Sequence, residues 1–414
     1  KKFQELCNKL NISNDDFIRT TEERHIKVVK QIFKKISSNN DIYKGKYEGN
    51  YCYGCEAFLT DKELVEGKCP EHNKKPKWLR EDVYFFKLSK YQDKVLRLIS
   101  KKDFITPKNY QKEIISRVKL EGLKDLCVTR TNLDWGIKTP IDDKHVIYVW
   151  LDALINYISA LDYPSEKFKK YWPESIHLIG KGINWFHSVI WPAILFSADI
   201  KPPKQIIVHG YVNLYGKKLS KSAGKIIDPI DLINKYGADS LRYYLIREIP
   251  FGEDGDFSEE ILKSKINNEL ANDLGNLLSR VLTLVEKNFN GKLDKSNIDK
   301  KLKSKLELKK ISDYIDKYEL HNALSEIWKF VNNCNKHINE EKLWEMQGDK
   351  LQNHLYTLLE SIRIIAILLS SFMPETSGKI YKQLGIKCNS LDECKFGLIK
   401  SYNIKKGEIL FKKV

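Results

Sequence analysis

The chain has 414 residues, of which 42% are hydrophobic, and 71 Lys+Arg against 55 Asp+Glu give it a formal net charge of +16. This length predicts more than one domain, and the hydrophobic content excludes an intrinsically disordered chain. The positive excess favours a polyanionic partner, although a lysine-rich composition by itself accounts for part of it. The most apolar window, residues 355–372, contains Glu360 and Arg363 and predicts a buried helix rather than a membrane span.

The first predicted element is a helix over residues 14–37, in which Thr20 and Glu23 can form a capping box. Residues 42–77 are rich in Gly, Tyr, Cys and Lys and have too few aliphatic side chains to form a core, so something else must hold them. Further along, one helix is predicted at 88–100 and another at 184–196, and apolar runs predict strands at 145–150, 176–179 and 205–208. Strands alternating with helices indicate a parallel sheet.

Glycines 180, 182 and 210 follow two of these strands, where open α/β sheets bind ligands. From residue 259 onward strand signals almost vanish, and helical periodicity predicts a bundle from segments 259–290, 301–338 and 350–372. The lysine-rich stretch 299–310 is predicted to be the solvated face of a helix, with contact to a tRNA or another polyanion as the alternative.

A cysteine cluster lies in the core-poor segment. Cys52 and Cys55 are followed after thirteen residues by Cys69 and His72, which gives a C-x2-C and a C-x2-H pair. Two such turns can present four ligands to one tetrahedral ion, and thiolates with one imidazole suit a structural Zn²⁺. Two disulfides, or four unrelated residues, are the alternatives. The metal would supply the stability that apolar burial cannot.

A loop rich in lysine, serine and glycine follows the last predicted strand, at residues 216–225. Glycine allows close backbone approach to a ligand, and lysine and serine supply charge and donors for phosphate. The order of residues is not that of a Walker loop. By itself such a loop is more often an exposed turn, but Lys218-Leu-Ser-Lys-Ser222 resembles the KMSKS signature of class I aminoacyl-tRNA synthetases, with Leu219 in place of Met.

Four further motifs occur in the order found in the methionyl-tRNA synthetase family, which the chain resembles from Asp16 to Phe411. They are Tyr148-Val-Trp-Leu-Asp-Ala153, Gly180-Lys-Gly-Ile-Asn-Trp-Phe-His-Ser188, His209-Gly-Tyr-Val212 and Pro250-Phe-Gly-Glu-Asp-Gly-Asp-Phe-Ser258. The resemblance implies an α/β, Rossmann-like (HUP-type) nucleotide-binding fold with a zinc-knuckle connective peptide, followed by an all-α anticodon-binding bundle.

The same resemblance implies a division of the chain into five parts. These are the end of the first half of the nucleotide fold (1–40), the connective peptide with the zinc knuckle (41–140), the second half of the fold (141–216), the KMSKS loop and stem-contact region (217–258), and the anticodon-binding domain (259–414).

The implied reaction joins methionine to ATP, releases pyrophosphate, and then transfers the methionyl group to the 3′ end of tRNA(Met), with Mg²⁺ accompanying ATP. Lys221 is expected to stabilise charge on the departing pyrophosphate, with Lys218 and Ser220 in support. ATP binding is expected to involve these three residues together with His209, Gly210 and Val212. The sequence expectation also includes a cytoplasmic or organellar location and a monomer, unless a C-terminal domain is appended.

The methionine side chain is expected in a pocket of mostly aromatic residues, which suits a thioether. The positions that match the family are Trp150, Ala153, Tyr157, Phe186, His187 and Trp191. Without the family match, such tryptophans are more often ordinary core residues. Gly182 departs from the family, which has Asp at this position, so recognition of the amino group is expected to differ.

Asn276, Arg280 and Trp344 match the residues by which the family recognises the CAU anticodon. An indole can stack on an unpaired base while Asn and Arg bond its edge. The family's His-x-Gly-His signature does not occur in the sequence, and the expectation is that residues carrying it precede Lys1. The alternatives are another class I synthetase, for example one for cysteine, and a synthetase-derived tRNA-binding module without catalysis.

Overall fold

The computed structural model describes residues 2–55, 57–59, 61–131, 133, 135–214, 217–218, 227–387 and 390–414. The chain divides into two compact units, which are Asp15–His209, here called the sheet unit, and Lys1–Asn14 with Gly210–Val414, here called the helical unit. The five-part division expected from the sequence stays a prediction.

The first helix of the sheet unit is α2 (Glu23–Ser38), which buries Val29, Ile32 and Phe33 along one face. The predicted helix is therefore confirmed in its second part, but its start was placed too early. Glu22 stands at the N-cap without a side-chain capping bond, so the predicted Thr20–Glu23 capping box is wrong. The Glu22 carboxylate instead accepts a hydrogen bond from the backbone N–H of Arg19, 3.0 Å away.

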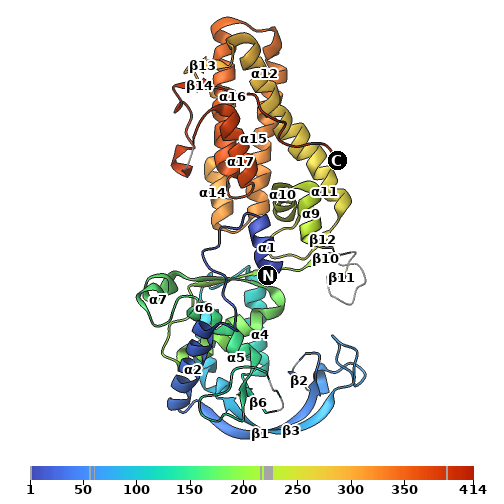
Figure 1. Ribbon diagram of the computed structural model, residues 1–414, viewed down its shortest axis with the longest axis vertical. Helices are drawn as coiled ribbons and strands as arrows, with labels where there is room; N and C mark the ends of the chain where they lie inside the picture. The colour runs from blue at the N-terminus through green and yellow to red at the C-terminus, as the bar shows by residue number, and fades with distance from the viewer. Residues whose placement is uncertain are drawn as a thin grey trace. The chain divides into compact units, whose positions relative to one another are not determined.

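An antiparallel sheet occupies much of residues 42–127, in the strand order β2-β1-β3-β5. Its two long strands, β1 (Ile42–Cys52) and β3 (Lys77–Phe86), pair along nearly their whole length and curve together in Figure 1. Both shorter strands, β2 (Ala57–Leu59) and β5 (Leu126–Cys127), pair at the edges. Most of β1 is exposed or half-buried, which explains why the sequence has so few aliphatic residues there.

The predicted parallel sheet exists, with the order β4-β9-β8, in which β4 is Ile105–Thr106. β8 (Ile176–Gly180) and β9 (Gln205–His209) confirm two of the predicted strands. The third predicted strand, at 145–150, is largely wrong, because β7 (Val146–Ile147) pairs antiparallel with β6 (Thr129–Arg130) and helix α5 (Val149–Leu154) follows at once. A short apolar run fits a strand and a buried helix equally, and here Leu151 and Leu154 pack into the core.

Helices cover the rest of the sheet unit. They are α3 (Gln92–Ile99), α4 (Lys108–Glu121), α6 (Asn156–Ser159), α7 (Glu166–Tyr171), a π-helix at Phe186–Ile190 and α8 (Trp191–Ser197). The helices predicted at 88–100 and 184–196 are thereby confirmed in type. Their buried side chains share one hydrophobic core with the parallel sheet.

The helical unit begins with α1 (Lys2–Lys9) and continues through a small sheet of order β11-β10-β12. Its further elements are β10 (Val212–Leu214), β11 (Lys217–Lys218), α9 (Pro229–Tyr236), α10 (Ala238–Glu248), β12 (Gly255–Phe257), α11 (Glu259–Lys265), a π-helix at Ile266–Gly275, α12 (Asn276–Phe289), β13 (Lys292–Asp294), α13 (Lys300–Lys303), α14 (Leu308–Asp316), α15 (Leu320–Glu340), α16 (Gly348–Leu369), α17 (Pro374–Leu384) and β14 (Ser401–Asn403). The predicted bundle is confirmed.

The middle and end of α16 are buried on all sides, and its two charged residues there pair with each other. Arg363 donates to the Glu360 carboxylate at 2.8 Å, and both side chains are fully buried. Glu360 also accepts from the backbone N–H of Gly397 at 2.7 Å. The prediction of a buried helix is confirmed, and no helix among the described residues is long and apolar enough to cross a membrane.

Candidate functional site

Aromatic side chains from α5 and from the π-helix contact each other in the sheet unit. Trp150 and Phe186 stack with ring centroids 3.8 Å apart and an interplanar angle of 12°. Ala153 lies one turn after Trp150 on α5 and is half-buried. A π-helix in place of regular α-helix is frequent at functional sites, and here it carries both Phe186 and His187.

Tyr157 joins two of the predicted residues. Its hydroxyl lies 2.8 Å from Nε2 of His187, and its ring centroid lies 6.4 Å from that of Trp191. His187 Nδ1 lies 2.9 Å from the Ile183 carbonyl, which can only accept. Nδ1 therefore holds the proton, and Nε2 accepts the bond that the Tyr157 hydroxyl donates. Burial lowers the pKa of His187 and raises the pKa of Tyr157 to about 12, so both are neutral at pH 7.

His177, which was not predicted, completes this cluster from strand β8. Its ring stacks on Tyr157 at 3.9 Å, and its Nε2 accepts a hydrogen bond from Nε1 of Trp191 at 3.1 Å. Burial, followed by the neighbouring His187, lowers the pKa of His177 to about 3. One signal could have found it, because His177 is the only strongly polar side chain in the apolar run 176–179.

A second missed group fixes the helices that carry Trp150 and Tyr157. Buried His25 on α2 contacts Asp152 of α5 through Nε2 at 2.6 Å and Ser159 of α6 through Nδ1 at 2.8 Å. The imidazole thus connects three helices at fixed spacing. Because Asp152 lies between Trp150 and Ala153 on one helical turn, this contact sets the position of that turn.

The residues expected at the phosphates lie in two places along the chain. Gly180 and His209 are register partners at the carboxyl ends of β8 and β9. Gly210 is buried, and a Cβ there would lie 2.0 Å from the Glu253 carbonyl oxygen, so only glycine fits. Val212 begins β10, whose parallel partner is β12. Gly182 is exposed in the short turn after β8.

The lysine loop is described only at its start, where the backbone of residues 217 and 218 forms β11 and pairs with β10. Ser220 and Lys221 lie outside the described residues. Their assignment therefore stays a prediction, as does that of Lys218.

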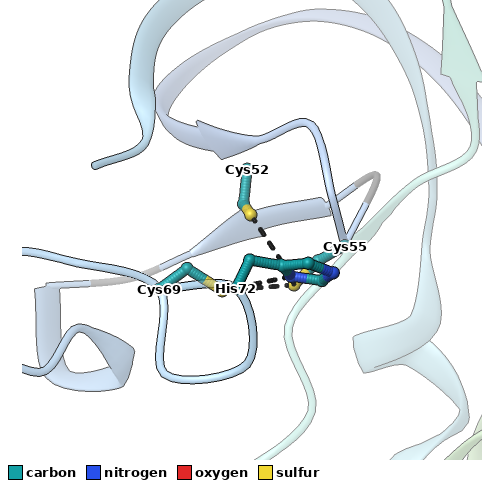
Figure 2. Close-up of side chains that lie close together, drawn as sticks. All are labelled: Cys52, Cys55, Cys69 and His72. Carbon is teal, nitrogen blue, oxygen red and sulfur yellow. Dashed lines mark hydrogen bonds between the residues drawn. The ribbon is translucent and has the colours of Figure 1, made fainter. Parts of the chain in front are cut away.

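The cysteine cluster brings its four predicted ligands together, as Figure 2 shows. Nδ1 of His72 lies 3.2 Å from Sγ of Cys55, 3.7 Å from Cys69 and 3.9 Å from Cys52, and the Cys55 and Cys69 sulfurs are 3.3 Å apart. A tetrahedral Zn²⁺ with bonds of about 2.0–2.3 Å has ligands about 3.3–3.8 Å apart. The distances between the three sulfurs and the His72 nitrogen are therefore close to those of four ligands around one Zn²⁺ ion. Cys52, Cys55 and Cys69 are all free cysteines.

Local backbone structure explains how the ligands converge. Cys52 ends β1, and the turn after it reaches Cys55, while a second turn after Cys69 is closed by the N–H of Asn73 on the Cys69 carbonyl at 2.8 Å. Gly54 lies directly against the His72 ring, and a Cβ there would come within 2.5 Å of it. Burial opposes the charged form of Cys69, but hydrogen bonds from His72 outweigh it and lower its pKa to about 6.

The three residues expected at the anticodon belong to the helical unit. Asn276 and Arg280 lie one turn apart on α12, where Asn276 is exposed. Arg280 donates to Oδ1 of Asn339 on α15 at 2.6 Å. Trp344, five residues after Asn339, has 53% of its surface exposed. The structure thus ties Arg280 to the end of α15, which leads directly to Trp344.

The catalytic family model described as tRNA synthetases class I (M) matches residues 1–77 and 72–282, and the model described as the anticodon-binding domain of tRNA ligase matches residues 299–409. A methionine–tRNA ligase of Caldanaerobacter subterraneus subsp. tengcongensis is 47% identical over 99% of this chain and 67% of its own length. The chain belongs to the methionyl-tRNA synthetase family. A relative from Clostridium acetobutylicum is 44% identical over 99% of the chain and 66% of its own length.

Solved members of the methionyl-tRNA synthetase family have the same fold. The Mycobacterium tuberculosis enzyme bound by methionyl-adenylate superposes with a TM-score of 0.93, at 38% identity over 99% of this chain and 85% of that one. Its free form gives a TM-score of 0.90 at 36% identity, over 100% and 86% of the two chains. The class I catalytic domain followed by an anticodon-binding domain is thereby established for this chain. It spans about two thirds of the curated relatives' length.

Proposed function

We propose that the protein carrying this chain is a methionine–tRNA ligase. The observation that supports this most is 47% identity to such a ligase over 99% of the chain. In the first step the methionine carboxylate attacks the α-phosphorus of ATP, the bond to pyrophosphate breaks, and methionyl-adenylate forms. In the second, the ribose hydroxyl at the 3′ end of tRNA(Met) displaces AMP. This role places the protein where translation occurs, which we expect to be the cytoplasm, and we expect it to act as a monomer.

Methionine-dependent ATP–pyrophosphate exchange by the full-length natural protein tests this function. Exchange that responds to cysteine instead would identify another class I synthetase. Binding of tRNA(Met) without exchange by any amino acid would identify a tRNA-binding module and would contradict the proposal.

The methionine pocket is proposed to consist of the six residues Trp150, Ala153, Tyr157, Phe186, His187 and Trp191. The stacked pair of Trp150 and Phe186 offers a flat aromatic surface, and sulfur–aromatic contacts contribute about 0.3–1.5 kcal/mol each. Burial keeps His187 neutral, and its two hydrogen bonds orient the ring. A neutral, immobile wall suits an uncharged thioether better than an imidazolium would.

Replacing Tyr157 with Phe is expected to raise the KM for methionine severalfold in the exchange reaction. Nε2 of His187 loses its donor, and a buried acceptor left unpaired costs about 1–3 kcal/mol of folding stability. Steady-state exchange over a methionine titration, with urea unfolding alongside, measures both effects. Tyr163→Phe removes a hydroxyl from the same unit away from the pocket and is the control. An unchanged KM in Tyr157→Phe would contradict this role.

Phosphate binding is proposed for Lys218, Ser220 and Lys221 of the loop, with His209, Gly210 and Val212. Negative charge grows on the pyrophosphate as the bond to it breaks, so fixed cations and donors are the main catalytic resource. Mg²⁺ is expected to arrive with ATP, since it is usually held by phosphates and few protein ligands. The glycine at 210 allows the backbone to approach closely, as it already does at Glu253.

Zinc is proposed as a structural ion held by Cys52, Cys55, Cys69 and His72. Four protein ligands close the coordination shell and leave no position for a substrate. Bound there, the ion would crosslink two turns in a segment with few apolar contacts. Cys52 and Cys69 are buried, whereas His72 is exposed.

The double variant Cys52→Ser, Cys55→Ser is expected to contain one metal equivalent less per chain than the unchanged protein. The apparent free energy of zinc binding in such modules is about 10–16 kcal/mol. The two turns should therefore unfold when the ion is lost. Elemental analysis measures the metal, and limited proteolysis should show new cleavage between residues 53 and 76. Cys7→Ser, which changes a cysteine in the helical unit, should alter neither. Equal metal content in both variants would remove zinc from this site.

A further inference from the structure

A second group of possible metal ligands lies inside the helical unit. Asp299, His337 and His354 each place one ligand atom within 4.8 Å of the other two. His337 comes from α15 and His354 from α16, and both are buried, with 5% and 8% of their surface exposed. Asp299 stands at the N-cap of α13. The three possible ligands therefore come from three separate elements. None of them has a role in the proposed ligase reaction.

The position of Asp299 is fixed by the surface of α16. Its backbone N–H donates to Oγ1 of Thr357 at 2.9 Å, and Thr357 lies one turn after His354. Just before it, Ser296 and Asn297 both donate to Oδ1 of Asn353, the residue that precedes His354. The whole segment 296–299 is thus attached to the helical turn that carries His354. One carboxylate oxygen of Asp299 accepts from the N–H of Leu302 at 2.6 Å, and a carboxylate has a second oxygen.

We propose that Asp299, His337 and His354 bind a divalent transition-metal ion of the Zn²⁺ class. Two imidazoles and one carboxylate form a donor set that such ions prefer, whereas Mg²⁺ and Ca²⁺ take oxygen ligands. Three protein ligands leave one tetrahedral position for water. This site is separate from the cysteine cluster, which belongs to the other unit.

The two histidine rings already lie close to the spacing that a shared ion requires. Nε2 of His337 and Nδ1 of His354 are 2.9 Å apart, so one of them donates a proton to the other. Two nitrogens on a tetrahedral ion with bonds of about 2.0–2.1 Å lie about 3.3 Å apart. The imidazoles need to separate by only a few tenths of an ångström. The histidine that donates in the ion-free state changes tautomer as the ion binds, so its proton moves to its other ring nitrogen and both rings stay neutral.

A pocket of about 220 Å³ gives access to His337 from solvent. It is lined by Lys301, Leu302, Lys305, Asn333, Lys336, His337 and Glu340. The lysines oppose a cation through space, so affinity must come from the coordinate bonds, and salt that screens this repulsion should not weaken binding.

Cobalt titration of the full chain, with the cysteine cluster already filled by Zn²⁺, tests the site. One further equivalent of Co²⁺ is expected to give visible d–d absorption without a thiolate charge-transfer band. Asp299→Asn keeps an N-cap acceptor for Leu302 and should leave the fold intact. It should nevertheless lower the Co²⁺ affinity at least about tenfold, as losses of metal-site groups do. His354→Gln should abolish the absorption, and His321→Gln, in the same unit, should leave it unchanged.

Circular dichroism of each variant confirms that the helices remain. Absorption that is the same in the unchanged chain, Asp299→Asn and His354→Gln would place the ion elsewhere and overturn the proposal. A complete lack of d–d absorption beyond the cysteine cluster would overturn it as well. Because the readout is metal binding, its failure leaves the proposed ligase function untouched.

Discussion

Replacing Lys221 with Ala should lower methionine-dependent ATP–pyrophosphate exchange by about 10²–10³-fold in kcat, while the KM for methionine changes little. Charge develops on the pyrophosphate only as its bond to the α-phosphorus breaks, so a lysine aimed at it contributes mainly in the transition state. Losing one preorganised group of this kind costs about 2.7–4 kcal/mol. Exchange kinetics over a methionine titration, with the full-length natural protein, separate the two constants.

Lys225→Ala is the matched control, because it removes the same charge from the same loop sequence but from outside the Lys-Leu-Ser-Lys-Ser signature. It should retain most of the exchange rate. Equal losses in Lys221→Ala and Lys225→Ala would attribute the effect to the overall charge of the loop. A rate in Lys221→Ala within a factor of two of the unchanged protein would end the catalytic assignment of Lys221.

Regular elements were predictable wherever burial on one or all sides leaves a periodic apolar pattern. The strands β8 and β9 and the long helices of the bundle are of this kind. In contrast, most side chains of β1 are exposed or half-buried, so its pairing with β3 leaves little trace in the polarity of its sequence. The prediction of a strand at 145–150 failed for the opposite reason, since the run is apolar from Val146 onward and its length does not separate strand from helix.

The candidate sites could be predicted where their residues are close together in the sequence, and were missed where they are far apart. Cys52, Cys55, Cys69 and His72 lie within 21 residues and could be paired from spacing alone, and the structure brings them together. The six pocket positions required the family resemblance. The contacts of His177 and His25 depend on segments that lie far apart in sequence and become neighbours only in the fold.

Two of the residues expected at the anticodon, Arg280 and Trp344, are restrained by neighbouring side chains. Arg280 is held by the Asn339 side chain, so its guanidinium is oriented before any RNA arrives. The half-exposed Trp344 indole has its Nε1 3.2 Å from a carboxylate oxygen of Glu345, which restrains the ring. Ordered side chains lose less entropy on binding, and a restrained aromatic face suits stacking on an unpaired base.

Trp344→Ala should therefore lower the kcat/KM for tRNA(Met) in aminoacylation by about 5–150-fold, which corresponds to about 1–3 kcal/mol for the loss of one base stack. Pyrophosphate exchange without tRNA should change by less than a factor of about two, because Trp344 touches neither ATP nor methionine in the proposed reaction. Trp135→Ala removes a tryptophan that is 74% exposed in the sheet unit and should leave both reactions unchanged. Parallel losses of exchange and aminoacylation in Trp344→Ala would instead indicate a folding defect, since only a contact with tRNA separates the two activities.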